Sequence, residues 1–309
     1  MKLILSVLLV VIALPASAGL IRHDVSDDMY TGFGNSAEFQ SVGLVSIDRG
    51  DAQGICSGTA IHKNWVLTAA HCLTSAQRMG LSINSSDNSG WRFYEASSWV
   101  AHENFNEANI FAGWDIGLMY FETDLDVSLA SLYRGNSEVF NYAYDVGFGY
   151  TGDGYTGIQS ADLLRRAGSN IVDFAWSEQG NGQQLLWSDF DHPTDPAYNT
   201  FYIDGVDFDD LATFLEIMIA PGDSGGATFV YEDGQLHVAG VHSFISDFTG
   251  DGAFGYGDAY ASTRVSSFVD WIDQKINPVA VPEPGMLWLS LFAFIALASR
   301  RMQTRGHAM

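Results

Sequence analysis

The chain has 309 residues, of which 47% are hydrophobic and 17% are charged, so it can bury one large core or two modest ones. Its formal net charge of −23, with only 14 Lys and Arg, argues against a nucleic-acid partner, because phosphate contacts need clustered basic side chains. The 32 glycines favour short strands joined by tight turns.

Residues 1–18 have the features of a signal peptide. Lys2 gives a positive start, residues 3–14 form an apolar run, and Ala16-Ser17-Ala18 supplies small residues for cleavage. The alternative is a membrane anchor, but the run is too short to span a bilayer. We therefore predict an exported protein that is cut by a signal peptidase and begins near Gly19.

Short β-rich runs bounded by Gly, Asn, Asp or Ser recur through the body of the chain. They occupy residues 42–47, 58–61, 65–68, 116–121, 139–149, 201–203, 227–231 and 237–241. No helical pattern between them is long enough for βαβ units. We therefore predict an all-β fold of two tandem antiparallel β-barrels.

One helix is predicted at the end of the body. Its apolar residues recur at helical spacing, at Val265, Phe268, Val269 and Ile272. Pro278 follows shortly after Ile276 and cannot continue a helix. The expected helix therefore runs through residues 266–276 and closes the body.

The C-terminal residues carry a second addressing pattern. Pro282-Glu283-Pro284 precedes an apolar run at 286–298 and the basic pair Arg300-Arg301. This order resembles the PEP-CTERM sorting signal, which implies removal of the tail by a membrane exosortase. It also implies a protein that is secreted, or held at the cell surface or in the extracellular matrix, of a Gram-negative bacterium. A permanent transmembrane helix with its arginines in the cytoplasm is the alternative, so membrane contact is expected only through this tail.

Three segments carry the parts that nucleophilic serine catalysis requires. They are Thr68-Ala-Ala-His71-Cys72, Trp114-Asp115-Ile-Gly-Leu118 and Gly222-Asp223-Ser224-Gly225-Gly226. Each segment alone is weak evidence, since a glycine-rich turn or a lone histidine is usually structural. Together they predict Ser224 as the nucleophile, His71 as the base and Asp115 as the residue that orients the imidazole.

In this order the segments resemble the chymotrypsin/trypsin family of serine endopeptidases. Residues 56–72 are similar to the histidine segment of the family almost position by position. The resemblance implies hydrolysis of protein or peptide substrates through an acyl-enzyme, without a cofactor, and an oxyanion hole formed by the N–H groups of Gly222 and Ser224. The expected parts are the signal peptide at 1–18, an N-terminal arm at 19–37, a two-barrel protease domain at 38–277 with its barrel boundary near 135–145, and the sorting tail at 278–309.

Cys56 and Cys72 are the only cysteines in the sequence. In an exported protein such a pair favours a disulfide, and closing this loop of about 16 residues contributes about 3 kcal/mol. Ligation of a metal by Cys72 and His71 is the alternative, but no second Cys/His cluster has the spacing of a zinc site. We therefore expect a disulfide and no metal.

The specificity pocket departs from the family pattern. Met218 stands where trypsins carry the aspartate that selects basic residues, and Ile245 stands where the family keeps a glycine. Tyr260 falls near another usual glycine, and Ser243 and Phe244 lie in the segment similar to the strand that binds the substrate backbone. These residues predict a shallow apolar site that prefers small residues at P1, the residue before the cleaved bond.

The activation segment is also unusual. Family members pair a newly formed N-terminal ammonium with the aspartate before the catalytic serine, here Asp223, but no family-like cleavage junction is visible in this sequence. The partner of Asp223 and the existence of a zymogen stay open. The second functional hypothesis is an inactive protease homologue that acts as an extracellular binding or matrix protein, although such a protein would usually have lost a triad residue.

Overall fold

The computed structural model describes residues 19–87, 89–198, 202–203, 206–207 and 212–277. Contacts divide the chain into a first unit that ends at Ile272 and a second that begins at Asp273. All the sheets described below lie in the first unit, and only residues 273–277 are described in the second. The predicted signal peptide and sorting tail lie outside the described residues.

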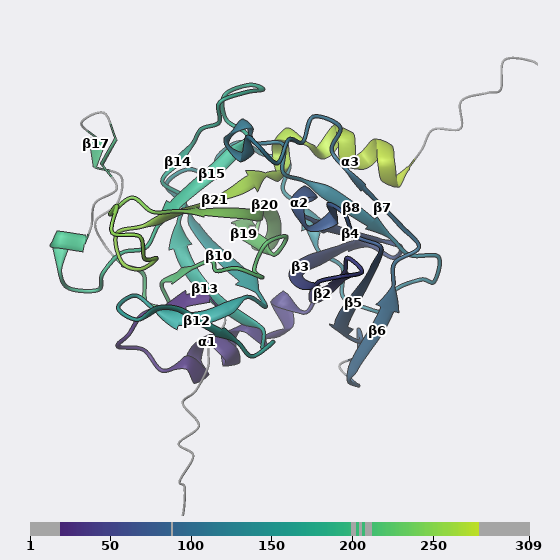
Figure 1. Ribbon diagram of the computed structural model, residues 1–309, viewed down its shortest axis with the longest axis horizontal. Coiled ribbons are helices and arrows are strands. Elements are labelled where there is room, and N and C mark those ends of the chain that lie inside the picture. The colour runs from purple at the N-terminus through teal and green to yellow at the C-terminus, as the bar shows by residue number, and fades with distance from the viewer. Residues whose placement is uncertain (1–18, 88, 199–201, 204–205, 208–211, 278–309) are drawn as a thin grey trace, which may run out of the picture. The chain divides into compact units, whose positions relative to one another are not determined.

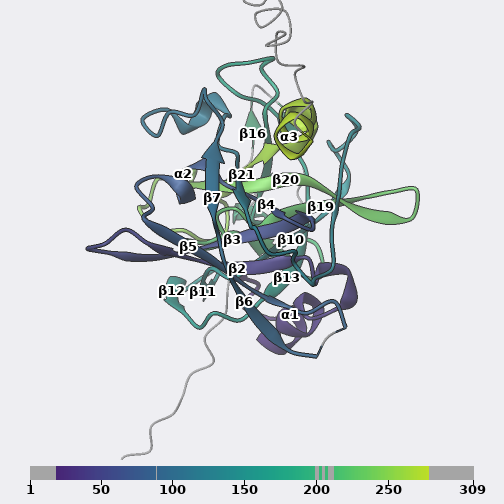
Figure 2. The ribbon, with the colours of Figure 1, turned by 90° about the vertical axis from the view of Figure 1, so that its right-hand side faces the viewer.

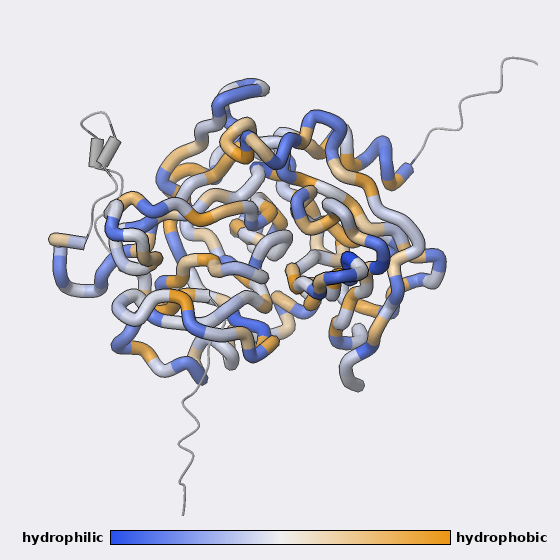
Figure 3. The backbone as a smooth tube through the Cα atoms, in the orientation of Figure 1, coloured by the Kyte–Doolittle hydropathy of each residue, from blue (hydrophilic) through white to orange (hydrophobic). Residues whose placement is uncertain are grey.

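The first half of the chain forms an antiparallel sheet in the order β6-β5-β2-β3-β4-β8-β7 (Figure 1). Its strands are β2 (Val42–Asp48), β3 (Gln53–His62), β4 (Trp65–Thr68), β5 (Arg78–Asn84), β6 (Trp91–Glu95), β7 (Ser98–Ala101) and β8 (Gly117–Tyr120). Side chains alternate along them, as in β2, where Val45 and Ile47 are buried and Ser46 is exposed. Figure 3 shows hydrophobic and hydrophilic stretches interspersed along the chain. This period of two is the geometry of strands with one buried face, in a region where a short β-rich run predicted a strand at residues 42–47.

The second half forms a sheet in the order β13-β10-β19-β20-β21-β15-β14, and β9 pairs in parallel with β20 (Figures 1 and 2). Its strands are β9 (Ser131–Leu132), β10 (Tyr142–Gly147), β13 (Arg166–Ile171), β14 (Phe174–Ala175), β15 (Leu185–Asp189), β19 (Ala227–Glu232), β20 (Gln235–Ser246) and β21 (Ala259–Arg264). The pairs other than β9 with β20 are antiparallel. Two curled antiparallel sheets of this kind confirm the predicted all-β fold.

Residues 19–37 contribute to the second half of the fold. β1 (Gly19–Ile21) lies between β11 (Tyr150–Asp153) and β18 (Ile217–Met218), and β12 (Gly157–Ala161) completes this four-stranded sheet. Leu20 is fully buried in β1. Tyr30, on α1 (Asp27–Gly34), is also buried and donates its hydroxyl to the Glu216 carbonyl at 3.0 Å. Gly19–Ile21 and Tyr30 therefore anchor this segment in the core.

The remaining elements are short. They are α2 (Ala70–Leu73), α3 (Val269–Ile276), β16 (Tyr202–Ile203), β17 (Val206–Asp207) and the 3-10 helices at Ala37–Phe39, Ile110–Ala112, Pro196–Tyr198 and Val265–Ser267. The last 3-10 helix and α3 together confirm the predicted C-terminal helix. At its start, the Trp271 indole donates to Glu103 Oε2 at 3.0 Å. None of the helices in the described residues is long and apolar enough to cross a membrane.

Candidate active site

His71 lies on α2, the short helix that follows β4. Ala70 and Leu73 are buried, whereas the His71 side chain keeps 25% of its surface exposed. Just before the helix, Thr68 Oγ1 donates to the Ser57 carbonyl at 2.9 Å. The helix is thus anchored on both sides of a histidine that faces outward.

Asp115, which precedes β8, holds this histidine by two bonds. Its carboxylate is completely buried. Oδ1 accepts the backbone N–H of His71 at 2.9 Å, and Oδ2 lies 2.7 Å from His71 Nδ1. Oδ2 also accepts the hydroxyl of Ser243 at 2.5 Å. Because Nδ1 faces a carboxylate, it carries the proton, and Nε2 is left to accept one.

The pKa of His71 is raised above its ordinary value. Burial by itself lowers the pKa, but the charge of Asp115 and its hydrogen bond outweigh burial, and Glu107 adds a smaller effect in the same direction. The imidazolium is therefore stabilised beside Asp115.

Ser224 lies in a tight loop between β18 and β19. Glycine is required on both sides of it, since Gly222 has φ +96° and Gly225 has φ +82° with an added Cβ only 2.1 Å from Thr68 Oγ1. Ser57 on β3 braces the loop, donating its N–H to the Ser224 carbonyl at 2.8 Å and its hydroxyl to the Gly222 carbonyl at 3.0 Å. In the described part of the chain, the amides of Gly222 and Ser224 have no protein acceptor, so both are available to bind an anion.

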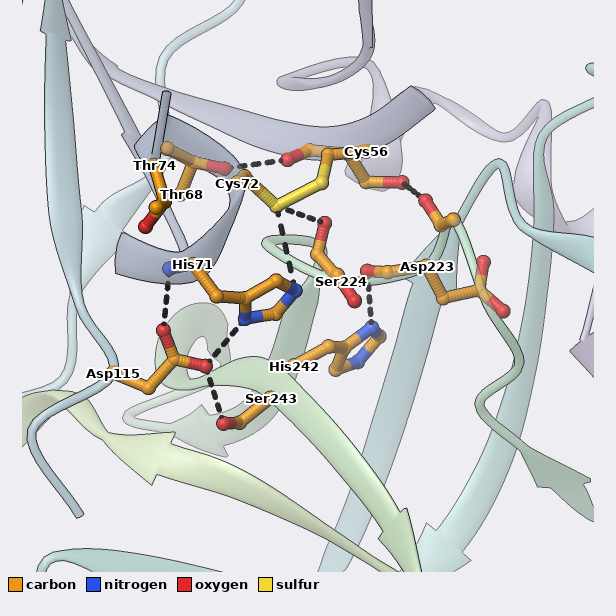
Figure 4. The surroundings of a disulfide bond; sticks show 12 residues. Cys56, Thr68, His71, Cys72, Thr74, Asp115, Asp223, Ser224, His242 and Ser243 are labelled. Carbon is orange, nitrogen blue, oxygen red and sulfur yellow. Dashed lines mark hydrogen bonds and ion pairs between the residues drawn. A yellow bond between two sulfur atoms is a disulfide. The ribbon is translucent and has the colours of Figure 1, made fainter. Parts of the chain in front are cut away.

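Ser224 and His71 meet beside the disulfide (Figure 4). Cys72 Sγ lies 3.7 Å from His71 Nε2 and also 3.7 Å from the Ser224 carbonyl oxygen. Among the described contacts, no hydrogen bond joins Ser224 Oγ to Nε2. Such bonds are often loose in free enzymes and tighten when substrate binds.

The predicted disulfide between Cys56 and Cys72 is confirmed, with 1.98 Å between the sulfurs. The two sulfurs and His71 gather within 4.8 Å, which is close enough for metal ligands. Both sulfurs are, however, bonded to each other, and a metal needs thiolates. The alternative of a metal bound by Cys72 and His71 therefore does not fit the oxidised protein.

Asp223, directly before Ser224, is buried and faces away from the triad. Its Oδ1 accepts the N–H of Gly149 at 2.7 Å, and its Oδ2 accepts that of Ala220 at 2.9 Å. Burial raises the pKa of this carboxyl to about 6, although the charge of His242 and the two amides oppose the rise. The site would therefore gain stability from a further positive charge.

Comparison with known proteins places the chain in a family. The Trypsin family model matches residues 33–272. The chain belongs to the trypsin family of serine proteases. Chymotrypsin-like elastase family member 1 of Macaca fascicularis is 29% identical over 245 residues, covering 76% of this chain and 84% of that relative.

Other relatives agree. Proproteinase E of Bos taurus is 28% identical over 234 residues, covering 72% of this chain and 83% of that protein. The solved structure of HL collagenase has a TM-score of 0.57 and 19% identity, covering 84% of this chain and 98% of the collagenase. This last likeness shows the two-sheet fold alone, because the identity is low.

The predicted pocket residues of this trypsin-family chain fall into separate environments. Met218 and Tyr260 are buried in one cluster, and Ile245 packs against it from β20. Phe244 packs instead with Trp187 on the other side of β20. Phe244 therefore packs apart from Met218, Ile245 and Tyr260.

Ser243 is predicted to lie in the strand that binds the substrate backbone, and its hydroxyl donates to Asp115. Ser57, which braces the serine loop, was missed in the sequence, although it directly follows Cys56 in the histidine segment. Tyr260 donates its hydroxyl to Asp145 at 2.5 Å, and Asp145 was also missed. These contacts join segments far apart in the chain, so no local pattern reveals them.

An aromatic cleft opens beside Phe244. Its volume is about 550 Å³. It is lined by Phe111, Phe174, Ala175, Trp176, Glu178, Trp187, Ser246 and Phe248. The Phe244 ring centroid lies 4.9 Å from that of Phe111 and 5.4 Å from that of Trp187, so the cleft adjoins the strand that carries Ser243.

Proposed function

We propose that this protein is a serine endopeptidase that uses His71, Asp115 and Ser224. The observation that carries the proposal is the buried Asp115 carboxylate, which binds both the backbone and the ring of His71 and leaves Nε2 facing the Ser224 loop. An inactive homologue has no need for this arrangement.

In the proposed reaction, Ser224 Oγ attacks the peptide carbonyl carbon while His71 Nε2 takes the hydroxyl proton. The resulting oxyanion is bound by the N–H groups of Gly222 and Ser224. When the C–N bond breaks, His71 gives the proton to the leaving amine. Water then attacks the acyl-enzyme by the same route, and Asp115 holds the imidazole in one tautomer throughout.

A fluorophosphonate probe tests this proposal. Attack by Ser224 forms an Oγ–P bond and releases fluoride, so peptide mapping should find the label on Ser224 of the wild type and none on Ser224→Ala. Wild-type protein that is folded but does not react would support the second hypothesis, an inactive homologue that acts as a binding or matrix protein.

We further propose that the P1 site takes small aliphatic residues. Met218 and Tyr260 are almost fully buried, and the Tyr260 hydroxyl is bonded to Asp145, so neither side chain is placed to move aside. Ile245 pairs with Tyr260 across the strands and packs on the same cluster. One relative carries the name chymotrypsin-like elastase family member 1, which supports an elastase-like site.

The aromatic cleft would then supply the binding energy that a shallow P1 site lacks. β20 pairs with β19 only as far as Val241, so an extended peptide can pair with the residues that follow and pass from Ser243, beside Asp115, toward Ser246, at the cleft. Exposed rings there, including Phe111 and Trp176, can cover an apolar substrate side chain. We propose that this side chain lies a few residues before the cleaved bond.

A peptide-library cleavage profile tests both parts of the specificity. We expect Ala or Val at P1, with a loss of about 10- to 100-fold for each poorly fitting methylene. We also expect a preference for aromatic residues at one upstream position, which Trp176→Ala should weaken while leaving the P1 preference unchanged. Exposed Phe93→Ala, on β6, is the control. Dominant cleavage after Arg, Lys or Phe would contradict the P1 proposal.

We propose that maturation creates a new N-terminus at Gly19, whose ammonium pairs with the buried Asp223 carboxylate. β1 runs parallel to β11, with Gly19 opposite Thr151, and antiparallel to β18. Followed toward Gly19, these strands lead to Gly149 on one side and Ala220 on the other, the two residues whose amides hold Asp223. Removal of residues 1–18 would therefore leave the ammonium of Gly19 directed at this buried carboxyl.

Intact mass measurement of the protein from its native host tests the processing. We expect a chain that starts at Gly19, and one extra alanine before Gly19 should lower activity at least tenfold, because it displaces the ammonium by about 3.3 Å. A chain produced to start at Gly19 is the control. Equal activity of the two would contradict the proposed ion pair.

The same measurement tests the C-terminal proposal. A sorting tail of the PEP-CTERM type would be removed near Pro282 to Pro284, and the protein would be found outside the cytoplasm. Recovery of a chain that ends at Met309 from the cell surface would favour the membrane anchor instead.

A further inference from the structure

A second histidine–carboxylate pair lies behind the Ser224 loop. His242 on β20 and Asp145 on β10 are each only 1% exposed, and His242 Nε2 lies 3.0 Å from Asp145 Oδ1. Figure 4 shows the ring of His242 on the side of the loop that carries Asp223. The pair makes no contact with His71 or Asp115 among the described hydrogen bonds, so the proposed reaction does not use it.

Asp145 is surrounded by donors. Besides His242, it accepts the hydroxyl of Thr228 at 2.7 Å and that of Tyr260 at 2.5 Å. Burial and the charge of Asp145 raise the pKa of Tyr260 far above its ordinary value, so Tyr260 stays a phenol and donates. A buried carboxylate with three donors is best satisfied in its ionised form.

Both nitrogens of His242 face groups that only accept. Nδ1 lies 3.3 Å from the carbonyl oxygen of Asp223, and Nε2 faces the Asp145 carboxylate. A neutral imidazole has one N–H and would leave one of these acceptors facing a lone pair. An imidazolium satisfies both, and Asp145 balances its charge.

The other ionisable groups around His242 belong to three neighbouring segments. Tyr260 on β21 bonds Asp145, and the Asp223 carboxylate is held by backbone amides. Arg166 on β13 lines the same small cavity, but its guanidinium bonds Asp27 and Asp162. Asp145 is therefore the carboxylate that meets the His242 ring directly.

The backbone of His242 also forms hydrogen bonds with the loop that carries Ser224. Its carbonyl accepts the N–H of Gly225 at 2.8 Å, and its N–H donates to the Gly226 carbonyl at 3.0 Å. An added Cβ on Gly226 would lie 2.8 Å from His242 Nδ1, so glycine is needed for this approach. His242 thus contacts the loop through its ring and through both of its backbone polar groups.

The Asp223 carbonyl has a direct link to catalysis. It belongs to the same planar trans peptide as the N–H of Ser224, one of the two proposed oxyanion donors. This carbonyl accepts the N–H of Gly226 at 2.8 Å, and His242 Nδ1 adds a second, charge-assisted bond. The two groups of a trans peptide point in opposite directions, so holding the Asp223 carbonyl in place also sets the direction of the Ser224 N–H.

We propose that His242, as an imidazolium paired with Asp145, is a positioning residue that aims the Ser224 amide at the oxyanion. The inference rests on the proposed peptidase function. It predicts that activity depends on a positive charge that never touches the substrate.

Asp145→Asn tests the role of the charge. We expect kcat to fall by about tenfold to a hundredfold with little change in KM, because the variant disturbs a group used in the transition state. His62→Gln, a half-buried histidine on β3, is the control and should change neither value.

Two substitutions of His242 separate positioning from packing. His242→Asn places an amide N–H near the position of Nδ1 and should keep more kcat than His242→Gln, whose amide reaches toward Asp145. Rates are divided by the folded fraction from near-ultraviolet circular dichroism. If the two variants have equal rates, or if Asp145→Asn keeps the wild-type kcat, the proposal is wrong.

Nuclear magnetic resonance of ¹⁵N-histidine-labelled Ser224→Ala protein gives a test that is independent of catalysis. His242, assigned from the spectrum of a variant that also carries His242→Gln, should show protons on both ring nitrogens at pH 7. A neutral ring would overturn the proposal. A wild type that fails to react with the fluorophosphonate would instead overturn the peptidase function, while the spectrum would still report the charge of His242.

Discussion

Replacing Ser224 with alanine should reduce kcat for peptide cleavage by about 10⁶-fold, because the proposed nucleophile is lost. Folding should be preserved, since the loop is held by the Ser224 main-chain carbonyl, which accepts the N–H of Ser57, and not by the hydroxyl. Turnover of a peptide substrate, measured on protein of checked thermal stability, gives the result.

Ser46→Ala, which changes an exposed serine on β2, is the matched control and should keep full activity. A Ser224→Ala protein that still hydrolyses the substrate at the wild-type rate would remove Ser224 from the mechanism. A variant that is inactive but also unfolded would be replaced by Ser224→Cys, which retains a nucleophile and a similar volume.

Asp115→Asn should lower kcat by about 10⁴-fold. In the wild type, the His71 backbone N–H, the His71 ring and the Ser243 hydroxyl bond the two carboxylate oxygens of Asp115. The amide of the variant has only one oxygen to offer them. If its NH₂ group faces Nδ1, the ring proton moves to Nε2, and Nε2 can no longer take a proton from Ser224. The effect is therefore expected in kcat far more than in KM.

The pH profile gives a second readout of Asp115. His71 must be neutral to act as a base, and its pKa is raised above the ordinary value chiefly because Asp115 outweighs burial. Wild-type activity should therefore be lost as the pH falls through a value above about 6.5. In Asp115→Asn this acid limb should move to lower pH. An unmoved limb would show that another group controls it.

Ser243→Ala is the control for Asp115. It removes one hydroxyl donor from the carboxylate but leaves both bonds to His71. A hydrogen bond to a charged group is worth about 1.5–3 kcal/mol, so activity should fall by no more than about a hundredfold. A loss as large as that of Asp115→Asn would mean that Ser243 itself contacts the reacting groups.

Several features could be predicted from the sequence because each depends on a short continuous segment. The short β-rich run at residues 42–47 predicted a strand, and the spacing of Phe268 and Ile272 predicted the last helix. Cys56 and Cys72 are the only cysteines, so their pairing could be predicted without knowledge of the fold.

The surroundings of the candidate site were decided by tertiary structure alone. His242 and Asp145 are 97 residues apart, and Ser243 and Asp115 are 128 apart, so only the packing of distant strands and loops brings them together. The register of β20 against β21 shifts between His242 and Phe244. A bulge of this kind redirects neighbouring side chains, and a period-two pattern does not reveal it.

The sequence by itself therefore determined the fold class, the disulfide and the three segments that carry His71, Asp115 and Ser224, because local patterning and residue chemistry specify them. Only the tertiary structure decided that Ser243 bonds Asp115, that Tyr260 lies in the core, and that β1 pairs with the two strands next to the residues that bond Asp223. Those outcomes depend on the pairing of distant strands, whose geometry is set by the packing of the whole core.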